Sequence, residues 1–461
     1  MTTPMTHSQR LIVAIAVLGS FVAFLDGTVV NVALPAIARE LGGGLSTQQW
    51  TVDAYLVTLG ALILVAGAAS DAYGRILVLR IGLIGFGVAS LAVAGAPTIE
   101  LLIAARALQG LAGAFLVPSS LALITSTMSD PVRSRAIGIW TSLTTGAMIA
   151  GPLLGGVIVD HVSWRWVFLI NVVPIGAALW LLTRLDVRDE RRPDARIDWP
   201  GAIMCTAGLG LAVLALIELP NGGPASIWLW IALALGILLF AAFIVRQRTV
   251  PQPLLPLDLF RSRTFASGNL ATLFIYAALS LNGFVVAVYL QQGAGLSATL
   301  AGLASLPTTL LVIALSARVG VLSGRLGPRL FMTVGPLVMA TGCLLLLAVD
   351  TTFDYWWQIL PGMVMLGLGL AITVSPLTAA ILGAVDERRA GIASAVNNAV
   401  ARVAGLLAIA SLASIVGGTL DLDGFHRAAI VAAALLVAGA VVSAVGVRNP
   451  AGATQPPEDG P

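Results

Sequence analysis

Runs of about twenty apolar residues recur along the whole chain of 461 residues, and short polar or charged stretches separate them. A helix rises about 1.5 Å per residue, so a run of that length covers the ~30 Å of hydrocarbon in a bilayer. Helices are the expected spanning form because they satisfy their own backbone hydrogen bonds away from water. Since 58% of the residues are hydrophobic and only 10% are charged, a soluble fold would expose apolar surface everywhere. The sequence predicts an all-α polytopic membrane protein whose partner is the lipid bilayer.

The apolar runs can be counted and placed. Fourteen spans are expected, at 11–33, 49–69, 77–95, 98–120, 137–158, 166–183, 199–218, 227–245, 265–290, 298–318, 330–349, 357–380, 390–416 and 427–447. Because the count is even, both termini are expected on the same side of the membrane. Cys205 and Cys343 fall inside apolar runs, where we interpret them as packing thiols and not as a disulfide or a metal site.

The distribution of arginine predicts which side the termini occupy. All 25 basic residues are arginine; with the N-terminus inside, twenty lie in cytoplasmic segments, three in outer loops and two within spans. Such an excess of positive charge marks the cytoplasmic side. We therefore expect a bacterial cell membrane location with the N- and C-termini in the cytoplasm.

The two halves of the chain resemble one another. Gly67, Ser70 and Gly74 recur as Gly320, Ser323 and Gly327, which carries the second span onto the tenth. The matching residues are therefore eight spans apart. If the repeating unit has six spans, the other two form an insert between two six-helix bundles, and paired bundles of this kind build one large class of transporters. The expected division is a cytoplasmic N-terminus 1–10, a first bundle 11–185, a loop 186–198, the insert 199–246, a loop 247–264, a second bundle 265–448 and a disordered tail 449–461.

Ionisable residues at membrane depth are each a functional hypothesis. Asp26 and Arg106 both lie about 13 Å below the outer end of their spans, counted from Pro35 and Pro97. Burial would raise the pKa of Asp26 and a nearby Arg106 would lower it, which suits a carboxylate that exchanges a proton. The alternative is that the two residues form a fixed structural pair. Asp53, about one turn into the second span, is either a second proton or cation site or a solvated acid near the interface.

Few polar residues lie deep in the other spans. Arg402 lies deep in the thirteenth span, with Asn397 and Asn398 about one turn earlier. We expect a mostly apolar central cavity for a small-molecule substrate, with polar contacts from Gln109, Asn282, Asn397, Asn398 and Arg402.

Two glycine-rich segments are candidates for moving parts. In Gly146–Gly156 the residues Ala147, Gly151 and Gly155 form one stripe on which another helix can pack closely. Pro152 adds a bend point, so the stripe is either a hinge or a tight contact. The segment from Gly67 to Arg75 is expected to be a short cytoplasmic turn, in which Asp71, Gly74 and Arg75 form a charge latch or a solvated turn.

These segments together resemble the major facilitator superfamily, and within it the fourteen-span drug:proton antiporters. The stretch from Asp26 to Pro35 looks like the first-span motif, Gly67–Arg75 like the gating loop, Arg106–Gly110 like the fourth-span arginine motif, and Gly146–Gly156 like the fifth-span antiporter motif. The resemblance covers about 10–450 and implies two domains that rock about a central site, with protons as partners. One departure is Ala72, where the family usually has arginine.

The main functional prediction is a secondary active exporter of lipophilic drug-like or secondary-metabolite molecules, exchanged for protons by alternating access. Within transport, the alternatives are a dedicated exporter of one metabolite or an importer. A membrane-embedded enzyme would need surface clusters of carboxylates, histidines or metal ligands, and a sensor would usually carry a soluble domain; neither is evident. We expect no metal, cofactor or nucleic acid, and a monomer is expected to suffice.

Overall fold

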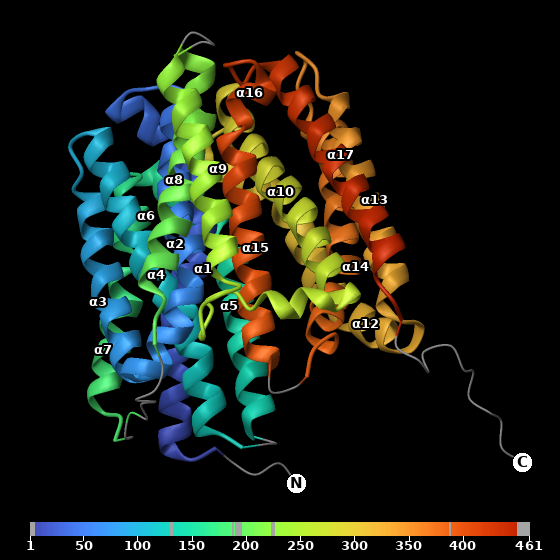
Figure 1. Cartoon of the computed structure of the whole chain (residues 1–461). Helices are drawn as coiled ribbons and strands as arrows, with labels where there is room; N and C mark the ends of the chain where they lie inside the picture. Colours follow the sequence, from blue (N-terminus) through green and yellow to red (C-terminus); the bar gives the residue numbers. More distant parts are fainter. Residues whose placement is uncertain are drawn as a thin grey trace, which may run out of the picture. The chain divides into compact units, whose positions relative to one another are not determined.

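The computed structural model describes residues 5–129, 132–186, 189, 196–222, 226–386 and 389–449, without the side chains of 149, 221 and 222. Every regular element among these residues is helical (Figure 1). Fourteen helical stretches are long and apolar enough to cross a membrane, counted over the described residues. The predicted fold class and number of spans are confirmed.

The elements in the first part of the chain are α1 (His7–Leu41), α2 (Leu45–Tyr73), α3 (Arg75–Ala94), α4 (Ile99–Thr127), α5 (Val132–His161), α6 (Arg165–Leu169), α7 (Val172–Thr183), α8 (Trp199–Gly222) and α9 (Ile227–Arg246). Those in the second part are η1 (Leu257–Arg261), α10 (Arg263–Gln292), α11 (Ala298–Ala304), α12 (Leu306–Leu326), α13 (Pro328–Leu345), η2 (Leu346–Ala348), η3 (Tyr355–Ile359), α14 (Leu360–Gly383), α15 (Ala390–Ala410), α16 (Leu412–Val416) and α17 (Leu422–Gly446).

The chain forms two compact units. Unit 1 consists of Met1–Leu255 and Leu290–Leu303, and unit 2 of Pro256–Tyr289 and Ala304–Pro461. Unit 1 therefore includes α8 and α9 as well as the turn that leads into α11. The assignment of two six-helix bundles with a two-span insert stays a prediction.

Two predicted boundaries are wrong. The first span was expected to end before Pro35, but α1 continues through that residue to Leu41. A proline inside a spanning helix is tolerated where neighbouring helices compensate for the missing hydrogen bond, and Pro35 is buried. The expected cytoplasmic turn at Gly67–Arg75 is also mostly helical, because α2 runs to Tyr73 and only Gly74 interrupts the helix before α3.

The internal repeat predicted from the sequence extends to backbone geometry. Gly74 and Gly327 both have positive φ, 102° and 83°, a conformation that glycine adopts at little cost. The N–H of each glycine donates to the backbone carbonyl oxygen of the serine four residues earlier, Ser70 or Ser323. The two residues thus end α2 and α12 in the same way.

The helices that follow these glycines are capped alike by residues far away in sequence. Asp189 accepts hydrogen bonds from the N–H groups of Ile76 and Leu77 at the start of α3, at 3.2 and 3.0 Å. Asn449 accepts one from Arg329 at the start of α13, at 3.1 Å. Asp189 follows the sixth span and Asn449 follows the fourteenth. The two capping residues are therefore eight spans apart, as are the helices that they cap. The rest of the expected disordered tail lies outside the described residues.

The helices α8 and α9 form a hairpin within unit 1. A Cβ atom on Gly208 of α8 would lie 2.9 Å from the backbone nitrogen of Phe240 and 3.0 Å from the carbonyl oxygen of Gly236 in α9, so the two backbones approach closely. At the other face, Trp50 of α2 donates a 2.8 Å hydrogen bond from Nε1 to Glu218 of α8. Glu218 thus connects the hairpin to α2.

Candidate functional site

Asp26 and Arg106 form a fully buried ion pair inside unit 1. Nη1 of Arg106 in α4 lies 2.6 Å from Oδ2 of Asp26 in α1, and neither side chain is exposed. Their similar depth in the predicted spans had indicated only that the charge of Arg106 could act on the carboxyl group of Asp26. Because α1 extends past Pro35, that residue was a wrong reference for the end of the span, but the two side chains meet at bonding distance.

Amide and hydroxyl groups complete the environment of the pair. Gln109 donates from Nε2 to Oδ1 of Asp26 at 3.0 Å and to Ser90 at 2.9 Å, and its Oε1 accepts from Nη1 of Arg106 at 2.7 Å. Asn171 donates to the same Oδ1 of Asp26 at 3.3 Å. All five residues are fully buried, and we call them the Arg106 cluster: Asp26, Ser90, Arg106, Gln109 and Asn171.

The remaining faces of the guanidinium are covered by α2 and α6. Nε of Arg106 donates to the backbone carbonyl of Thr51 at 2.9 Å. Its Cζ lies 4.4 Å from the ring centre of Tyr55 and 5.6 Å from that of Phe168, so aromatic faces stabilise the cation. The Arg106 cluster thus connects several helices of unit 1 around one buried ion pair, in which the charges of Asp26 and Arg106 offset one another.

This geometry corrects one site prediction. Gln109 was expected to contact substrate in a central cavity, but its side chain is fully buried and engaged by three members of the Arg106 cluster. Ser90 and Asn171 were not among the predicted site residues. The only signal for either residue in the sequence is a single polar side chain in an otherwise apolar run.

Asp53 is a buried acid in a very different environment. Its side chain is fully buried in α2, and within the described part of the chain neither carboxyl oxygen has a hydrogen-bond partner. The alternative of a solvated acid near the interface is wrong for this conformation. The reason is that α2 begins at Leu45, which adds a further turn of helix before Asp53.

The predicted central-cavity residues that the second half of the chain contributes fall into two groups. Asn397 of α15 donates to Asn269 and Thr272 of α10, at 3.3 and 2.8 Å, so it joins two helices. Asn282, Asn398 and Arg402 are half-buried, and no hydrogen bond or ion pair of their side chains occurs among the residues that the structure describes. These three side chains remain available for a ligand.

The small-residue stripe of α5 packs against the helix that carries Asp26. A Cβ atom on Gly155 would lie 2.6 Å from Cγ2 of Val29 and 2.8 Å from Cγ2 of Val32 in α1, and one on Gly151 would collide with Thr28. Ala147 in the same stripe is fully buried. Gly146, in contrast, has no atom within 4 Å of the position where its Cβ would lie. The stripe is therefore a close contact between α5 and α1, whereas Gly146 has no such role in packing. Pro152 lies inside α5, and its backbone closely approaches Gly302.

Replacing Gly155 with leucine is expected to lower stability, because the larger side chain must displace Val29 and Val32. Overpacking of this kind typically costs about 1–3 kcal/mol. Thermal unfolding of the purified protein in detergent measures the effect. Gly146→Leu in the same helix is the matched control and is expected to unfold near the wild-type temperature; equal losses in both variants would contradict the packing assignment.

The other face of α5 holds the start of α11, which also belongs to unit 1. Asp160 accepts hydrogen bonds from the N–H groups of Ala298 and Thr299, at 3.0 and 2.7 Å. A carboxylate at a helix N-terminus compensates the unpaired N–H groups and the positive end of the dipole. Gly156 and Gly302 give the two backbones room to meet, since a Cβ on either would collide with the opposite chain.

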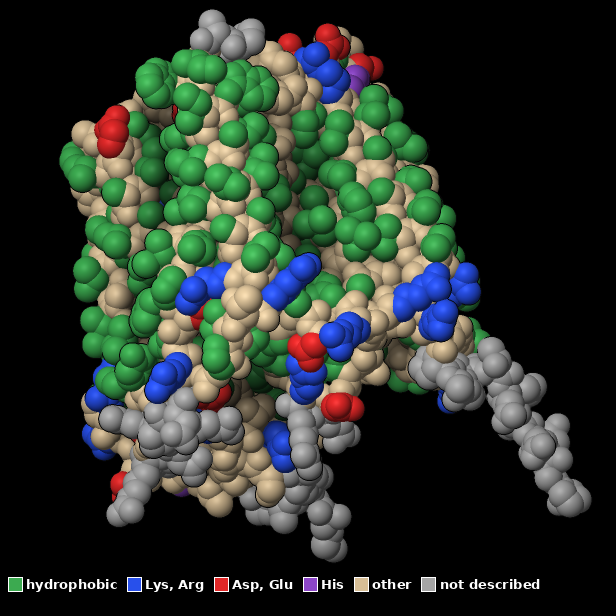
Figure 2. All heavy atoms as spheres, viewed as in Figure 1, with side chains coloured by type: hydrophobic (Ala, Val, Ile, Leu, Met, Phe, Trp, Pro, Cys, Tyr) green, Lys and Arg blue, Asp and Glu red, His purple; other side chains and the backbone are tan. Residues whose placement is uncertain are grey.

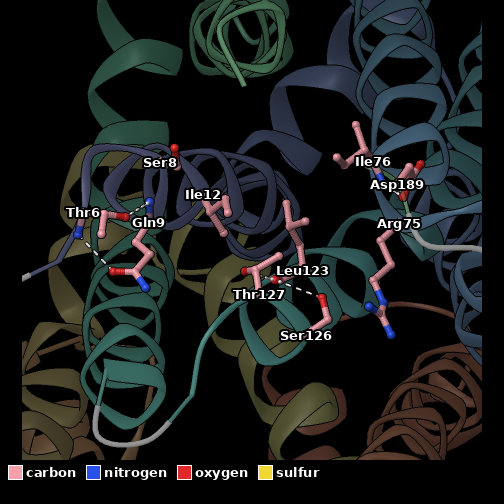
Figure 3. A pocket seen from close by; sticks show the side chains of 10 residues that line it. All are labelled: Thr6, Ser8, Gln9, Ile12, Arg75, Ile76, Leu123, Ser126, Thr127 and Asp189. Atoms are coloured by element: carbon pink, nitrogen blue, oxygen red, sulfur yellow. Dashed lines mark hydrogen bonds between the residues drawn. The ribbon is translucent and has the colours of Figure 1, made fainter. Parts of the chain in front are cut away.

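The predicted gating residues lie where α2 meets α3. Arg75 forms an ion pair with Asp71 at 3.7 Å, in which the two side chains are 18% and 41% exposed; such a pair contributes little energy at a solvated position. Figure 3 shows Arg75 beside Ile76 and Asp189, across a cavity of about 360 Å³ from Thr6 and Gln9. In this conformation Asp189 is therefore the stronger polar contact at the start of α3. Gly67 lies within α2 and its Cβ position is open.

A family model described as the Major Facilitator Superfamily matches residues 16–409, which include the Arg106 cluster, Asp53 and the α5 stripe. The chain belongs to the major facilitator superfamily. It is a membrane transporter, and the family resemblance seen in the sequence motifs is confirmed.

Relatives of known name are similar over most of the chain. Puromycin resistance protein pur8 of Streptomyces alboniger is 35% identical over 86% of this chain and 79% of its own length. The tetracenomycin C resistance and export protein of Streptomyces glaucescens is 33% identical over 87% and 74%. The multidrug resistance protein Stp of Mycobacterium tuberculosis (strain CDC 1551 / Oshkosh) is 32% identical over 90% and 78%.

Solved structures agree in fold. A peptide transporter of the POT family in complex with sulfate has a TM-score of 0.71 at 16% identity, covering 95% of this chain and 94% of its own. A D-xylose-proton symporter has a TM-score of 0.66 at 15% identity, covering 95% and 98%. At these identities the similarity concerns the fold alone.

Proposed function

We propose that this transporter exports lipophilic drug-like or secondary-metabolite molecules in exchange for protons. Support comes from the relatives, which are named for resistance to puromycin, for resistance to and export of tetracenomycin C, and for multidrug resistance. The α5 stripe, which resembles the antiporter motif, packs on the helix that carries Asp26. The resemblance of this segment to the antiporter motif favours export over import.

The observation that carries the proton-coupling part of the proposal is the contrast between Asp53 and Asp26. Asp53 is buried without a partner among the described residues, and an isolated buried carboxylate is costly unless it is protonated. When the surrounding helices open toward water, the ionised form regains its hydration and the proton can leave. We therefore propose Asp53 as a group whose protonation changes with conformation.

Asp26 has the opposite arrangement. Protonating it would leave the charge of Arg106 uncompensated in a fully buried site, and breaking such a pair is strongly unfavourable. Gln109 and Asn171 also donate to Asp26 in its acceptor form. We assign Asp26 and Arg106 to holding the helices of unit 1 together, and Asp53 to carrying the proton.

The substrate contacts are assigned to unit 2. Asn282, Asn398 and Arg402 are half-buried polar side chains of spanning helices without a hydrogen bond among the described residues. A pocket with a few polar groups in apolar walls suits lipophilic ligands that carry a polar substituent.

Orientation follows from charge. We propose that both termini lie in the cytoplasm of a bacterial cell, because an arginine excess is typical of cytoplasmic segments. We also propose a functional monomer, because a single chain supplies both units. An exporter so oriented moves its substrate from the cytoplasmic side to the outer side.

Inverted membrane vesicles test this proposal. When the lumen is acidified, an exporter is expected to accumulate a lipophilic dye or antibiotic inside and to release protons as it does so. A gradient of one pH unit is worth about 1.4 kcal/mol, or roughly tenfold accumulation for each proton exchanged. Vesicles without the protein, and vesicles treated with a potassium–proton exchanging ionophore, are the controls.

Other outcomes separate the alternatives. Accumulation that ignores the pH gradient would contradict antiport. Movement of substrate out of the vesicles, driven by the same gradient, would identify an importer. Proton release in response to only one compound among many structurally different ones would identify a dedicated exporter.

A further inference from the structure

A second cavity lies at the open end of the α8–α9 hairpin, away from the Arg106 cluster. Its volume is about 350 Å³. The segments just before α8 and just after α9 form its walls, and both belong to unit 1. Its lining residues are Arg196, Ile197, Asp198, Pro200, Arg246, Val250, Pro251 and Gln252.

The length of α9 places this cavity at the level of the lipid headgroups. The helix has 20 residues, Ile227–Arg246, and nearly all of them are apolar. At ~1.5 Å per residue it spans the ~30 Å of hydrocarbon and ends at its boundary. Trp199, the first residue of α8, is 51% exposed, as expected for an aromatic residue in the interfacial belt. Arg246 therefore lies where lipid phosphates lie.

The surface beside the cavity suits acyl chains. Few residues of α9 are buried, Gly236 and Phe243 among them. Leu238 and Val245 are 65% and 60% exposed on the half of the helix that leads to the cavity. Figure 2 shows hydrophobic side chains along this helix and basic side chains gathered near its end. A lipid at this position would contact apolar surface with its tails and arginine with its headgroup.

A buried carboxylate fixes one of the two arginines of the cavity. Asp198 is fully buried at its side chain and accepts from Nε of Arg246 at 2.8 Å, from Nε2 of Gln247 at 2.9 Å and from the N–H of Gly201 at 3.0 Å. Burial acts to raise the pKa of Asp198, but these hydrogen bonds hold it below its ordinary value. Asp198 thus stays ionised and covered, and it holds Arg246 through Nε while a third of that side chain stays exposed.

The second arginine is not neutralised. Arg196 is exposed, its backbone N–H donates to Oε1 of Gln252 at 2.6 Å, and its guanidinium makes no hydrogen bond or ion pair with any residue that the structure describes. Two guanidinium groups against one covered carboxylate leave a net positive charge at a cavity whose other walls include Ile197, Pro200, Val250 and Pro251.

We propose that this cavity binds the phosphate headgroup of an anionic phospholipid, with its acyl chains along the exposed face of α9. Guanidinium groups bind phosphate with paired, charge-assisted hydrogen bonds. An anionic lipid is favoured over a zwitterionic one, because the latter brings a cation of its own to a site with net positive charge. Basic pockets at the cytoplasmic ends of spanning helices are suited to such headgroups.

Native mass spectrometry of the full chain in detergent tests the proposal with phosphatidylglycerol and phosphatidylcholine of identical acyl chains. We expect preferential retention of phosphatidylglycerol, and a loss of about tenfold in its affinity in Arg196→Ala, since this variant removes one of the two guanidinium groups that would donate charge-assisted hydrogen bonds to the phosphate. Arg248→Ala, an exposed arginine of the same segment outside the cavity lining, is the matched control and is expected to bind like wild type. Equal losses in both variants, or no loss in Arg196→Ala, would overturn the proposal.

Two further experiments distinguish lipid binding from other uses of this cavity. Arg246→Lys keeps a cation beside the buried Asp198 but lacks the planar fork of guanidinium, so we expect weaker phosphatidylglycerol binding at an unchanged melting temperature. Inorganic phosphate and glycerol 3-phosphate at millimolar concentration are expected not to displace the bound lipid. Displacement by either would assign the cavity to a soluble phosphate compound and overturn the lipid proposal.

Discussion

Asp53→Asn is expected to abolish substrate accumulation driven by a pH gradient while leaving the protein folded. Asparagine has the shape of the protonated side chain but cannot release a proton. The site holds no hydrogen-bond partner that the replacement would lose, within the described residues, so the free energy of unfolding should change by no more than about 1 kcal/mol. With one proton carrier removed, accumulation at one pH unit should fall by about tenfold.

The measurement compares wild type and variant in inverted vesicles at equal protein content, with substrate-induced proton release recorded beside dye uptake. Substrate binding, measured by quenching of a fluorescent substrate, is expected to persist, because the proposed contacts at Asn282, Asn398 and Arg402 belong to unit 2. Normal proton release in Asp53→Asn would remove Asp53 from the mechanism and return Asp26 as the remaining acid of the proposed site.

Asp26→Asn is expected to lower stability much more than Asp53→Asn. The replacement leaves Arg106 fully buried without its carboxylate at 2.6 Å, and breaking a buried pair by removing one partner typically costs about 3–5 kcal/mol. Thermal unfolding in detergent should show a clear fall in melting temperature, and poor membrane yield is a second sign of the same loss.

A double variant separates loss of the charge pair from loss of shape. Asp26→Asn combined with Arg106→Gln removes both charges and is expected to be more stable than Asp26→Asn alone, with a coupling energy of about 0.5–3 kcal/mol between the two positions. Wild-type stability in Asp26→Asn, together with loss of proton coupling, would reverse the roles that we assign to the two acids.

The spans could be predicted because hydrophobic length and charge are local properties of the sequence. Fourteen apolar runs became fourteen spanning helices among the described residues, since each run must satisfy its own backbone in lipid. Their ends were less certain. Pro35 and Gly67 do not end helices, because packing of neighbouring helices outweighs the weak intrinsic preferences of single residues.

The sequence predicted several residues of the site, but not which of them contact one another. Asp26 and Arg106 were singled out as charges at matched depth, and they meet. Gln109 was assigned to the cavity, although it lies inside the Arg106 cluster. Its sequence neighbours could not show which way its side chain turns, because that depends on where α1 and α3 place Asp26 and Ser90.

By itself, the sequence determined that the chain spans a membrane fourteen times, that its halves repeat, and that very few charges lie at depth. Only the tertiary structure decided that, of two buried acids on neighbouring helices, one is paired and the other is without a partner among the described residues. The energy of a buried charge depends on the groups within a few ångströms of it, whatever their separation in sequence. Asp26 has its partners 80 to 145 residues further along the chain, and only folding brings them together.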